Sequence, residues 1–430
     1  MVTYYIIFIL IATLLLKLPF IFNEGMSINW LEAFFTSNSS VATSGLTLFN
    51  YQEVYNYAGW FVLIILFNLG GMGILVFNTA LMLFFGKKLG FRYRYLTKLD
   101  VNQSNSHNIG TLAKGVAITF ITVELIGAFL IFIFSFGMFP DLASQIMNSL
   151  FLSASAVSGS GFYDFSVYIN NFPVIWITIV LMIFSFIGYP VIMELIWWYQ
   201  AKRKGENFVF SSFTKIVVNV NLITIALFAF LFFSFEVDNS MSGLTLFQQI
   251  NASIFTSIST KSVGLSVFSD VSTFTTATLF LNAIFMIIGG SPSSACGGVK
   301  VVSIYIIYKY IVSTIKGDER VIFYNKRLSS EAITKSFLLV FSFVAVTIIA
   351  TFLISLLHPN LKVFYVWYDV VSGFTTTGFS TGVTGSIGGV SIFIMALLMG
   401  IGRIGIMNLM NYAKKDHGSN IEYLEVDIAI

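Results

Sequence analysis

Eight long apolar runs constrain what this chain can fold into more than any other feature of its sequence. Each is about long enough for a helix to cross the hydrocarbon core of a bilayer, which takes about 20 residues. Only 10% of the 430 residues are charged, whereas soluble domains carry about 25%. The sequence therefore predicts an all-α integral membrane protein with eight spanning helices. The runs are residues 4–22, 60–85, 116–139, 173–199, 216–235, 276–310, 336–357 and 388–410.

The first run could be mistaken for a secretory signal peptide. It has no basic segment before it and no small-residue cleavage site, and Lys17 lies inside it. We therefore expect residues 4–22 to form the first membrane helix. The single cysteine, Cys296, cannot form an internal disulfide, and three scattered histidines and one thiol do not make a soft-metal site. A net charge of +3 is too small to indicate nucleic-acid binding.

Four short polar segments, each enclosed by two apolar runs, resemble one another. Each ends in small hydroxyl residues followed by glycine and then Leu or Phe. The glycines Gly45, Gly161, Gly264 and Gly378 lie 116, 103 and 114 residues apart, which indicates a duplicated unit. One such segment alone would be an ordinary surface turn. Four of them predict four repeats of helix, pore loop and helix around a pseudo-fourfold pore, at residues 1–86, 87–200, 201–315 and 316–413, with a tail at 414–430.

Basic residues are distributed unevenly between the predicted helices. The linkers between repeats and the tail hold 18 of the 23 Lys and Arg residues, whereas the segments within repeats hold only Lys261 and Lys362. Cytoplasmic loops carry such an excess, so both termini are predicted to be cytoplasmic and the glycine loops to enter from outside. Depletion of basic residues alone would not explain the nine acids of the outer segments, which predict a cation-attracting vestibule. These are Glu24, Glu32, Glu53, Asp141, Asp164, Glu236, Asp238, Asp270 and Asp369.

The glycine loops have the composition that a cation filter needs. A loop at membrane depth is tolerated where it lines a water-filled path, and a dehydrated cation needs oxygens in place of its water. Backbone carbonyls supply them if the chain is extended and closely approachable, which glycine permits. We therefore expect the loops to bind a monovalent cation through carbonyls, with no catalytic residues. The predicted filter residues are Thr43, Ser44, Gly45, Ser160, Gly161, Val263, Gly264, Thr376, Thr377 and Gly378.

The sixth apolar run is interrupted near its middle. Proline removes a backbone donor and glycine weakens a helix, so the helix is predicted to break within residues 289–300. A plain kink is the alternative. The residues of this interrupting loop are Gly289, Gly290, Ser291, Pro292, Ser293, Ser294, Ala295, Cys296, Gly297 and Gly298.

Arg403 lies inside the last apolar run, where a charge costs about 2.5–3.5 kcal/mol on insertion scales. We expect it to contact the interrupting loop or to set a barrier to cations beneath the filter. Snorkelling to the inner surface is the alternative. The neighbouring Gly400, Gly402 and Gly405 match a G-x-G-x-x-G nucleotide fingerprint literally. That fingerprint needs a preceding strand, so we interpret these glycines as helix-packing residues and expect the chain to bind no nucleotide.

Together these features resemble the Ktr/Trk/HKT superfamily of potassium transporters, and specifically its KtrB-type membrane subunit. The resemblance covers essentially the whole length. It includes the four glycine loops, the basic linker after the first repeat and the short acidic C-terminus at residues 422–430. The other matching motifs are Gly86-Lys87-Lys88-Leu89-Gly90, Ile187-Gly188-Tyr189-Pro190 and Gly400-Ile401-Gly402-Arg403-Ile404-Gly405.

The resemblance implies potassium uptake across the plasma membrane, with one filter glycine per repeat and no enzyme activity. It implies that the interrupting loop is a mobile gate that obstructs the path beneath the filter, and we expect Arg403 to act with this gate. It also implies homodimers docked on a cytoplasmic ring of nucleotide-binding regulatory subunits of the RCK type. K⁺ would be the substrate, Na⁺ a coupled or activating ion, and no cofactor is expected.

A sodium-selective or sodium-coupled transporter of the same superfamily is the alternative. Glycine rather than serine at all four filter positions favours potassium. Two departures from the family pattern concern ion selectivity rather than architecture. Lys261 stands where the family usually has Arg, and residues 158–161 replace a stretch that is commonly rich in Asn.

Overall fold

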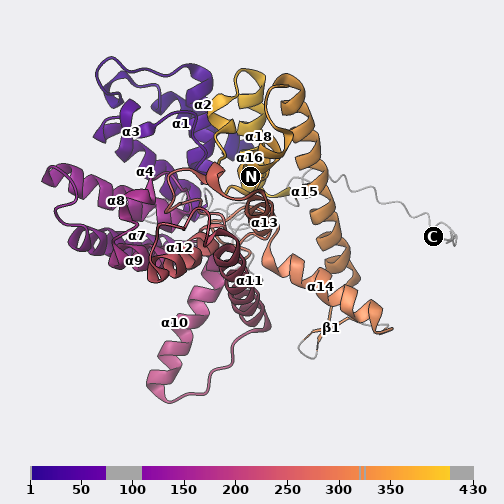
Figure 1. The fold of residues 1–430 in the computed structure, drawn as a ribbon. Helices are drawn as coiled ribbons and strands as arrows, with labels where there is room; N and C mark the ends of the chain where they lie inside the picture. Colours follow the sequence, from indigo (N-terminus) through magenta and orange to yellow (C-terminus); the bar gives the residue numbers. More distant parts are fainter. Residues whose placement is uncertain (1, 74–108, 319–320, 324–325, 407–430) are drawn as a thin grey trace.

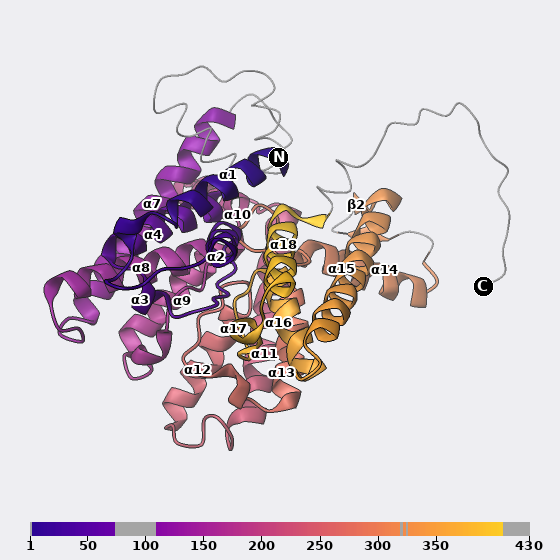
Figure 2. The same cartoon turned by 90° about the horizontal axis from the view of Figure 1, so that it is seen from above.

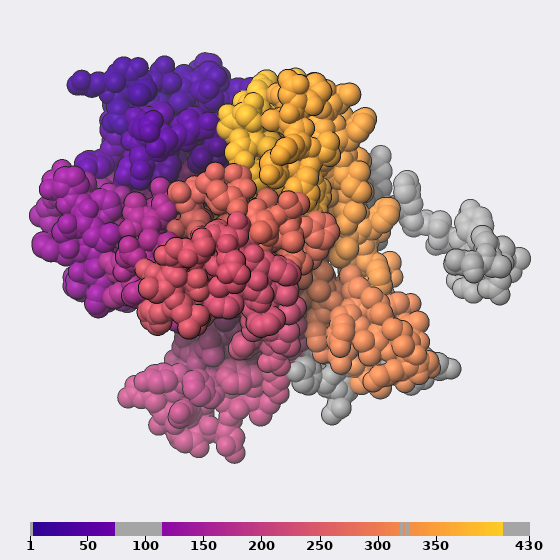
Figure 3. All heavy atoms as spheres, viewed as in Figure 1, coloured from indigo at the N-terminus to yellow at the C-terminus, as the bar shows by residue number. Residues whose placement is uncertain are grey.

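The main helices of this protein fall into four sets that follow one another along the chain. The computed structural model describes residues 2–73, 109–318, 321–323 and 326–406. The sets lie side by side around a common centre, and successive colours mark them in Figures 1 and 3. They are α1 (Val2–Leu15), α2 (Trp30–Ala42) and α4 (Tyr57–Met72); α7 (Ile109–Phe134), α8 (Leu142–Ser158) and α9 (Phe172–Ile187); α11 (Ser212–Glu236), α12 (Leu246–Ser259) and α13 (Thr276–Ile287); and α15 (Ser330–Leu357), α16 (Val363–Thr375) and α18 (Val390–Ile404).

The middle helix of each set packs against the last helix of the preceding set. α8 contacts α4, α12 contacts α9 and α16 contacts α13. The arrangement closes on itself because α2 of the first set contacts α18 of the last, and the two lie side by side in Figure 2. The four sets therefore form a ring, with the middle helices on its inner side.

Polar residues begin the middle helices, where backbone N–H groups lack helical partners. The side chain of Asn29 accepts a bond from the amide of Glu32, whose carboxylate returns one to Asn29. Thr245 and Gln248 do the same for α12, and Asp141 caps α8. Each cap stabilises its helix by about 1 kcal/mol. These caps fix the starting ends of α2, α8 and α12, whereas α16 follows Lys362 without a side-chain cap. The glycine loops follow the other ends of the four helices.

The sequence predicts one continuous helix over the run 173–199, but the structure has two helices there. α9 ends at Ile187, and α10 (Tyr189–Lys204) leaves it at an angle of 109°. Gly188 allows the bend because its φ of 83° is in the region that favours glycine. The backbone N–H of Tyr189 donates to Ser293 O (3.3 Å) instead of continuing α9. The prediction is wrong here because the apolar composition continues through the bend.

The sixth run is also divided, as its Pro and Gly residues predict. α13 ends at Ile287 and α14 (Val301–Ile315) begins after Lys300, so residues 288–300 connect the two helices. The ends of this connection stay together because Gly289 N donates to Val299 O (2.9 Å) and Val299 N donates to Ile287 O (3.0 Å). Beyond it, α14 lies along α15 (Figures 1 and 2).

Three of the described helices, α7, α11 and α15, are long and apolar enough to cross a membrane, and the bent pair α9–α10 would be a fourth. Helices α1, α4, α13, α14 and α18 are apolar but shorter. Parts of the runs 60–85 and 388–410, the motif at 86–90 and the tail at 414–430 lie outside the described residues. The remaining elements are α3 (Tyr51–Val54), α17 (Val383–Ser386), η1 (Pro19–Ile21), η2 (Phe165–Tyr168), η3 (Val271–Thr273) and a small antiparallel hairpin of β1 (Ile322–Phe323) and β2 (Lys326–Arg327).

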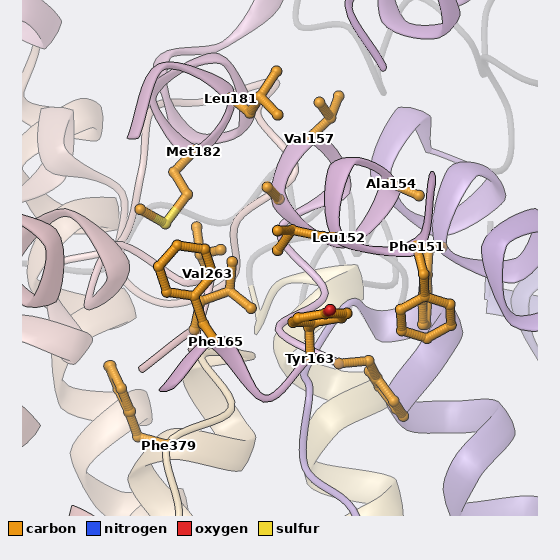
Figure 4. Close-up of a cluster of buried hydrophobic side chains, with 14 of the residues drawn as sticks. Phe151, Leu152, Ala154, Val157, Tyr163, Phe165, Leu181, Met182, Val263 and Phe379 are labelled. Atoms are coloured by element: carbon orange, nitrogen blue, oxygen red, sulfur yellow. The ribbon is translucent and has the colours of Figure 1, made fainter. Parts of the chain in front are cut away.

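Apolar side chains from different sets fill the space around the glycine loops. Phe165 stacks on Phe255 with ring centroids 4.5 Å apart, which joins the second set to the third. Figure 4 shows Val263 beside Phe165 and Met182, with Phe379 of the fourth set nearby. All of these side chains are buried. Close packing of this kind holds the loop backbone in one conformation.

Candidate functional site

The loops that follow the four middle helices share one backbone conformation. In each loop the filter glycine and the residue two positions before it have positive φ. A non-glycine residue with left-handed φ is strained by about 1–2 kcal/mol, and strain of this kind clusters at functional sites. Four loops of different sequence therefore follow the same path. The φ values are 55° and 82° at Thr43 and Gly45, 70° and 68° at Gly159 and Gly161, 69° and 73° at Ser262 and Gly264, and 53° and 103° at Thr376 and Gly378.

The four glycines form a closed ring. Each one faces the carbonyl oxygen of the residue that precedes the glycine of the next loop, and the fourth faces the first. A side-chain carbon at any of them would lie too close to that oxygen, so only glycine fits. The ring brings together the ten predicted filter residues. The distances from an added Cβ to the oxygen are 2.5 Å from Gly45 to Ser160, 2.3 Å from Gly161 to Val263, 2.0 Å from Gly264 to Thr377 and 2.5 Å from Gly378 to Ser44.

A serine near the end of each middle helix is hydrogen-bonded to the loop that follows. In three loops this serine is six residues before the glycine, but in the third it is five. Bonds of this kind are expected from the sequence, because Ser and Thr hydroxyls upstream of each glycine can hydrogen-bond the loop and hold it rigid. The hydroxyl of Ser39 donates to Leu46 O (2.7 Å) and that of Ser259 to Leu265 O (2.6 Å), while those of Ser155 and Ser372 accept from Ser160 Oγ (3.2 Å) and Gly378 N (3.0 Å).

The interrupting loop, residues 289–298, bonds directly to three of the four glycine loops. The backbone N–H of Gly297 donates to Ser262 Oγ (3.1 Å) and to Thr376 Oγ1 (3.0 Å). The hydroxyl of Thr43 donates to Ala295 O (3.2 Å). Thr43, Ser262 and Thr376, which make these bonds, are the strained residues two positions before the glycines. The loop is therefore seated against the ring itself.

The same loop is fastened to the second set at the end of α9. Ser291 N donates to Phe186 O (3.0 Å) and Ala295 N to Ser185 O (3.1 Å), while Ser291 Oγ donates to Ile187 O (2.7 Å). These carbonyls lose their helical partners where the chain bends at Gly188. The remaining loop residues fold back on one another. Ser294 Oγ donates to Ser291 O (2.6 Å), and Ser291 Oγ also donates to Pro292 O (2.9 Å). Gly289 and Gly290 lie against Gly297 and Cys296, next to Gly298.

Lys261 of the third loop joins the ring to the broken helix. Its side chain is fully buried, and Nζ donates to Ile288 O (3.1 Å), just beyond the end of α13. A cation at the carbonyl end of a helix is favourable. Cys296 Sγ donates to Lys261 O (3.0 Å), and Lys300 Nζ donates to Cys296 O. Sequence reasoning treated Lys261 only as a departure from the family pattern and missed the part played by Cys296 and Lys300.

Arg403 bonds to the end of the first set. Its guanidinium donates to the carbonyl oxygens of Gly70 and Gly71 at the end of α4, the latter at 3.4 Å. These bonds place its charge at a helix carbonyl end within the ring of helices. The neighbouring Gly402 has the close packing that its motif predicts, because an added Cβ would lie 2.0 Å from Phe374 O.

The nine outer acids are not all free to attract cations. Glu236 and Asp369 are buried, and their carboxylates accept hydrogen bonds from neighbouring loops. The vestibule prediction is wrong for these two, because a buried, fully bonded carboxylate does not face water. Asp141 and Asp270 are exposed but cap helices, namely α8 and the short η3. Among the described residues, no group of three or more His, Cys, Asp or Glu residues could hold a metal ion.

Asp369 organises the backbone that follows Gly378. Oδ1 accepts from the amide and hydroxyl of Thr381, and Oδ2 accepts from Ser380 Oγ and from the amide and hydroxyl of Thr384. Five donors thus converge on one buried side chain.

We expect Asp369→Ala to destabilise the protein by about 2–3 kcal/mol, because it leaves several buried donors without an acceptor. The measurement is thermal unfolding of the purified protein in detergent. Asp270→Ala is the matched control, since Asp270 is an exposed cap and its loss costs about 1 kcal/mol. Equal losses in the two variants would contradict the structural role of Asp369.

Comparison with known proteins agrees with this architecture. The TrkH family, described as cation transport proteins, matches residues 2–422. The chain is 28% identical to the Ktr system potassium uptake protein D of Bacillus subtilis over 98% of this chain and 94% of that protein. It is also 28% identical to the Ktr system potassium uptake protein B of Vibrio alginolyticus, over 96% and 90%.

A solved structure has the same fold. The crystal structure of the potassium transporter TrkH from Vibrio parahaemolyticus superposes with a TM-score of 0.76 and 16% identity, over 96% of this chain and 85% of that one. The matched family is one of transporters, not enzymes. With its apolar helices, the chain is a membrane protein. It belongs to the TrkH family of cation transport proteins.

Proposed function

We propose that the chain conducts potassium across the plasma membrane through the ring of four glycine loops. The observation that carries this proposal is the closed ring, in which each glycine faces a carbonyl oxygen of the next loop. Rings of backbone carbonyls replace the hydration shell of a potassium ion. The filter would consist of Thr43, Ser44, Gly45, Ser160, Gly161, Val263, Gly264, Thr376, Thr377 and Gly378. The names of the relatives as potassium uptake proteins support the choice of ion.

The four sets of helices are the four repeats in this proposal. Their boundaries would be 1–86, 87–200, 201–315 and 316–413, with a cytoplasmic tail at 414–430. The cyclic packing of each middle helix against the preceding set supports a pseudo-fourfold axis through the ring. Eight spans would result from two membrane crossings per repeat. The excess of basic residues in the linkers supports cytoplasmic termini and linkers.

The interrupting loop would be a gate in its closed position. Its bonds to Thr43, Ser262 and Thr376 support this role, since they seat the loop where conducted ions would leave the ring. Arg403 would contribute positive charge near the same exit. Opening would then require these bonds to exchange for others, which is the behaviour of a two-state element.

Regulation would come from a cytoplasmic ring of nucleotide-binding subunits of the RCK type, on which a homodimer of this chain docks. The relatives are named as components of a Ktr system, which supports a multi-component assembly. Lys202, Arg203 and Lys204 form a basic end of α10 on the side proposed to be cytoplasmic. No cofactor is proposed for the chain itself, with K⁺ as substrate and Na⁺ as an activating ion.

We expect this chain to restore growth of a potassium-uptake-deficient bacterium on low potassium, and more strongly with a regulatory subunit. The measurement is growth together with cellular K⁺ and Na⁺ content. An empty vector and the well-folded filter variant described in the Discussion are the controls. Failure of rescue with sodium accumulation would overturn the potassium assignment in favour of a sodium-selective or sodium-coupled transporter.

A further inference from the structure

Glu124 is a buried carboxyl group near the middle of α7, away from the glycine ring's own loops. Its side chain is only 5% exposed. One side-chain bond holds it: Asn68 Nδ2 of α4 donates to Glu124 Oε1 (3.2 Å). This bond joins the first set of helices to the second.

One side-chain oxygen of Glu124 and the side-chain oxygen of Asn68 take no part in this hydrogen bond. Glu124 Oε2 and Asn68 Oδ1 are both buried and have no hydrogen-bond partner within the described residues. Buried polar atoms without partners are rare and call for an explanation. Both atoms are acceptors if Glu124 is ionised, so they cannot satisfy one another in that state.

In the described helices that pack against α7, no cation offsets a charge on Glu124. α7 contacts α4, α8 and α9, and none of these three helices contains Lys, Arg, His, Asp or Glu. The one titratable side chain in these three helices is Tyr57, at the start of α4. Tyr189 of α10 also contacts α7, but it does so near Gly115, away from Glu124. The one other charge on α7 is Lys114, ten residues or about 15 Å along the helix. An ionised carboxylate would therefore be buried without a counter-ion, which is costly.

We propose that Glu124 is a proton-binding site, in which the neutral acid donates from Oε2 to Asn68 Oδ1. Together with the bond from Asn68 Nδ2 to Oε1, this makes a reciprocal acid–amide pair. A single proton then gives a partner to both leftover atoms and removes the unpaired charge. The inference does not depend on which ion the chain transports.

The pair of Glu124 and Asn68 lies beside α8, which leads to one glycine loop, and beside the end of α4, which contacts α8 and Arg403. Ser153 Oγ of α8 donates to the backbone oxygen of Glu124 (2.6 Å), and α8 leads to Gly161. Two residues beyond Asn68, Gly70 accepts the bond from Arg403, and Gly71 packs against Ser158 at the end of α8. Loss of the proton would set two acceptor oxygens against each other and loosen α4 from α7 beside these contacts.

The test uses the full chain in lipid vesicles and infrared difference spectroscopy between acidic and alkaline pH. We expect a C=O band of a protonated carboxyl group that is absent in Glu124→Gln. Asn68→Leu should move this band to the position of an acid without a hydrogen bond. Glu194→Gln is the matched control, because Glu194 is half-buried and accepts a backbone bond from Ser211, and it should leave the band unchanged.

Thermal unfolding gives a second, independent reading. Glutamine can form the same two bonds with Asn68 without a proton, so Glu124→Gln should retain stability at every pH. The parent protein should lose several degrees of melting temperature relative to this variant as the pH rises and Glu124 ionises. A C=O band that persists in Glu124→Gln, or a parent and variant that melt alike at all pH values, would overturn the proposal. Stabilisation of the parent by sodium but not by acid would overturn it in favour of a cation site.

Discussion

Gly264→Ser is expected to abolish selective potassium uptake. A side-chain carbon at Gly264 would lie 2.0 Å from Thr377 O, which is the tightest contact of the ring, and the φ of 73° adds about 1–2 kcal/mol for any other residue. The carbonyl of Thr377 must therefore move. Because about 1.4 kcal/mol corresponds to a tenfold change in binding, we expect the preference for K⁺ over Na⁺ to fall by about tenfold or more.

The measurement is competitive uptake of K⁺ and Na⁺ into vesicles that contain the purified variant. Gly243→Ser is the matched control, since Gly243 precedes α12 in a turn and an added Cβ there meets nothing within 4 Å. It should transport like the parent. An unchanged ion preference in a folded Gly264→Ser protein would remove this glycine from the filter.

Deletion of residues 291–296 is expected to raise potassium flux. The deletion removes the acceptor of the bond from Thr43 and all the bonds to the end of α9 that Ser291 and Ala295 make. The new connection can close because Gly289 and Val299 are already hydrogen-bonded across the ends of the loop (2.9 Å). Each lost bond stabilises the closed state by about 1 kcal/mol, so we expect flux to rise by about tenfold or more.

Flux of K⁺ into vesicles, with and without a regulatory subunit, measures this effect. A large organic cation in the same vesicles distinguishes an opened gate from a damaged, leaky protein, because it should remain excluded. Thr43→Val is the milder variant, which removes one of these bonds and should raise flux less. Unaltered or reduced flux in a folded deletion variant would argue that the interrupting loop is structural.

Much of the architecture could be predicted from the sequence because it is repeated. The spacing of the four glycines indicated four equivalent loops, and the Gly–Pro cluster after Ile287 indicated a broken helix. Both inferences use local signals, namely residues whose backbone preferences differ from those of their neighbours. The bend at Gly188 carried a similar signal, but the apolar residues on both sides of it resembled one continuous run.

Long-range contacts were beyond the reach of the sequence. The bond between Lys261 and Ile288 joins residues that no periodicity relates, and a lysine in a polar loop gives no sign that it is fully buried. The third loop also has its supporting serine, Ser259, one position closer to the glycine, so alignment on the glycines points to Ile258 instead. The burial of Asp369 was missed because charge counts locate a side chain on one side of a membrane without revealing what surrounds it.

The closed ring of glycines also limits how the four glycine loops can change over evolutionary time. Each glycine lies close to a carbonyl oxygen of the next loop. The loop that carries this glycine in turn presents a carbonyl oxygen to the glycine of the preceding loop. A substitution at Gly161 therefore requires the backbone carbonyl of Val263, in the next loop, to move at the same time. The ring therefore couples four separate stretches of sequence, so that a glycine in one loop can be replaced only if the backbone of the next loop changes with it.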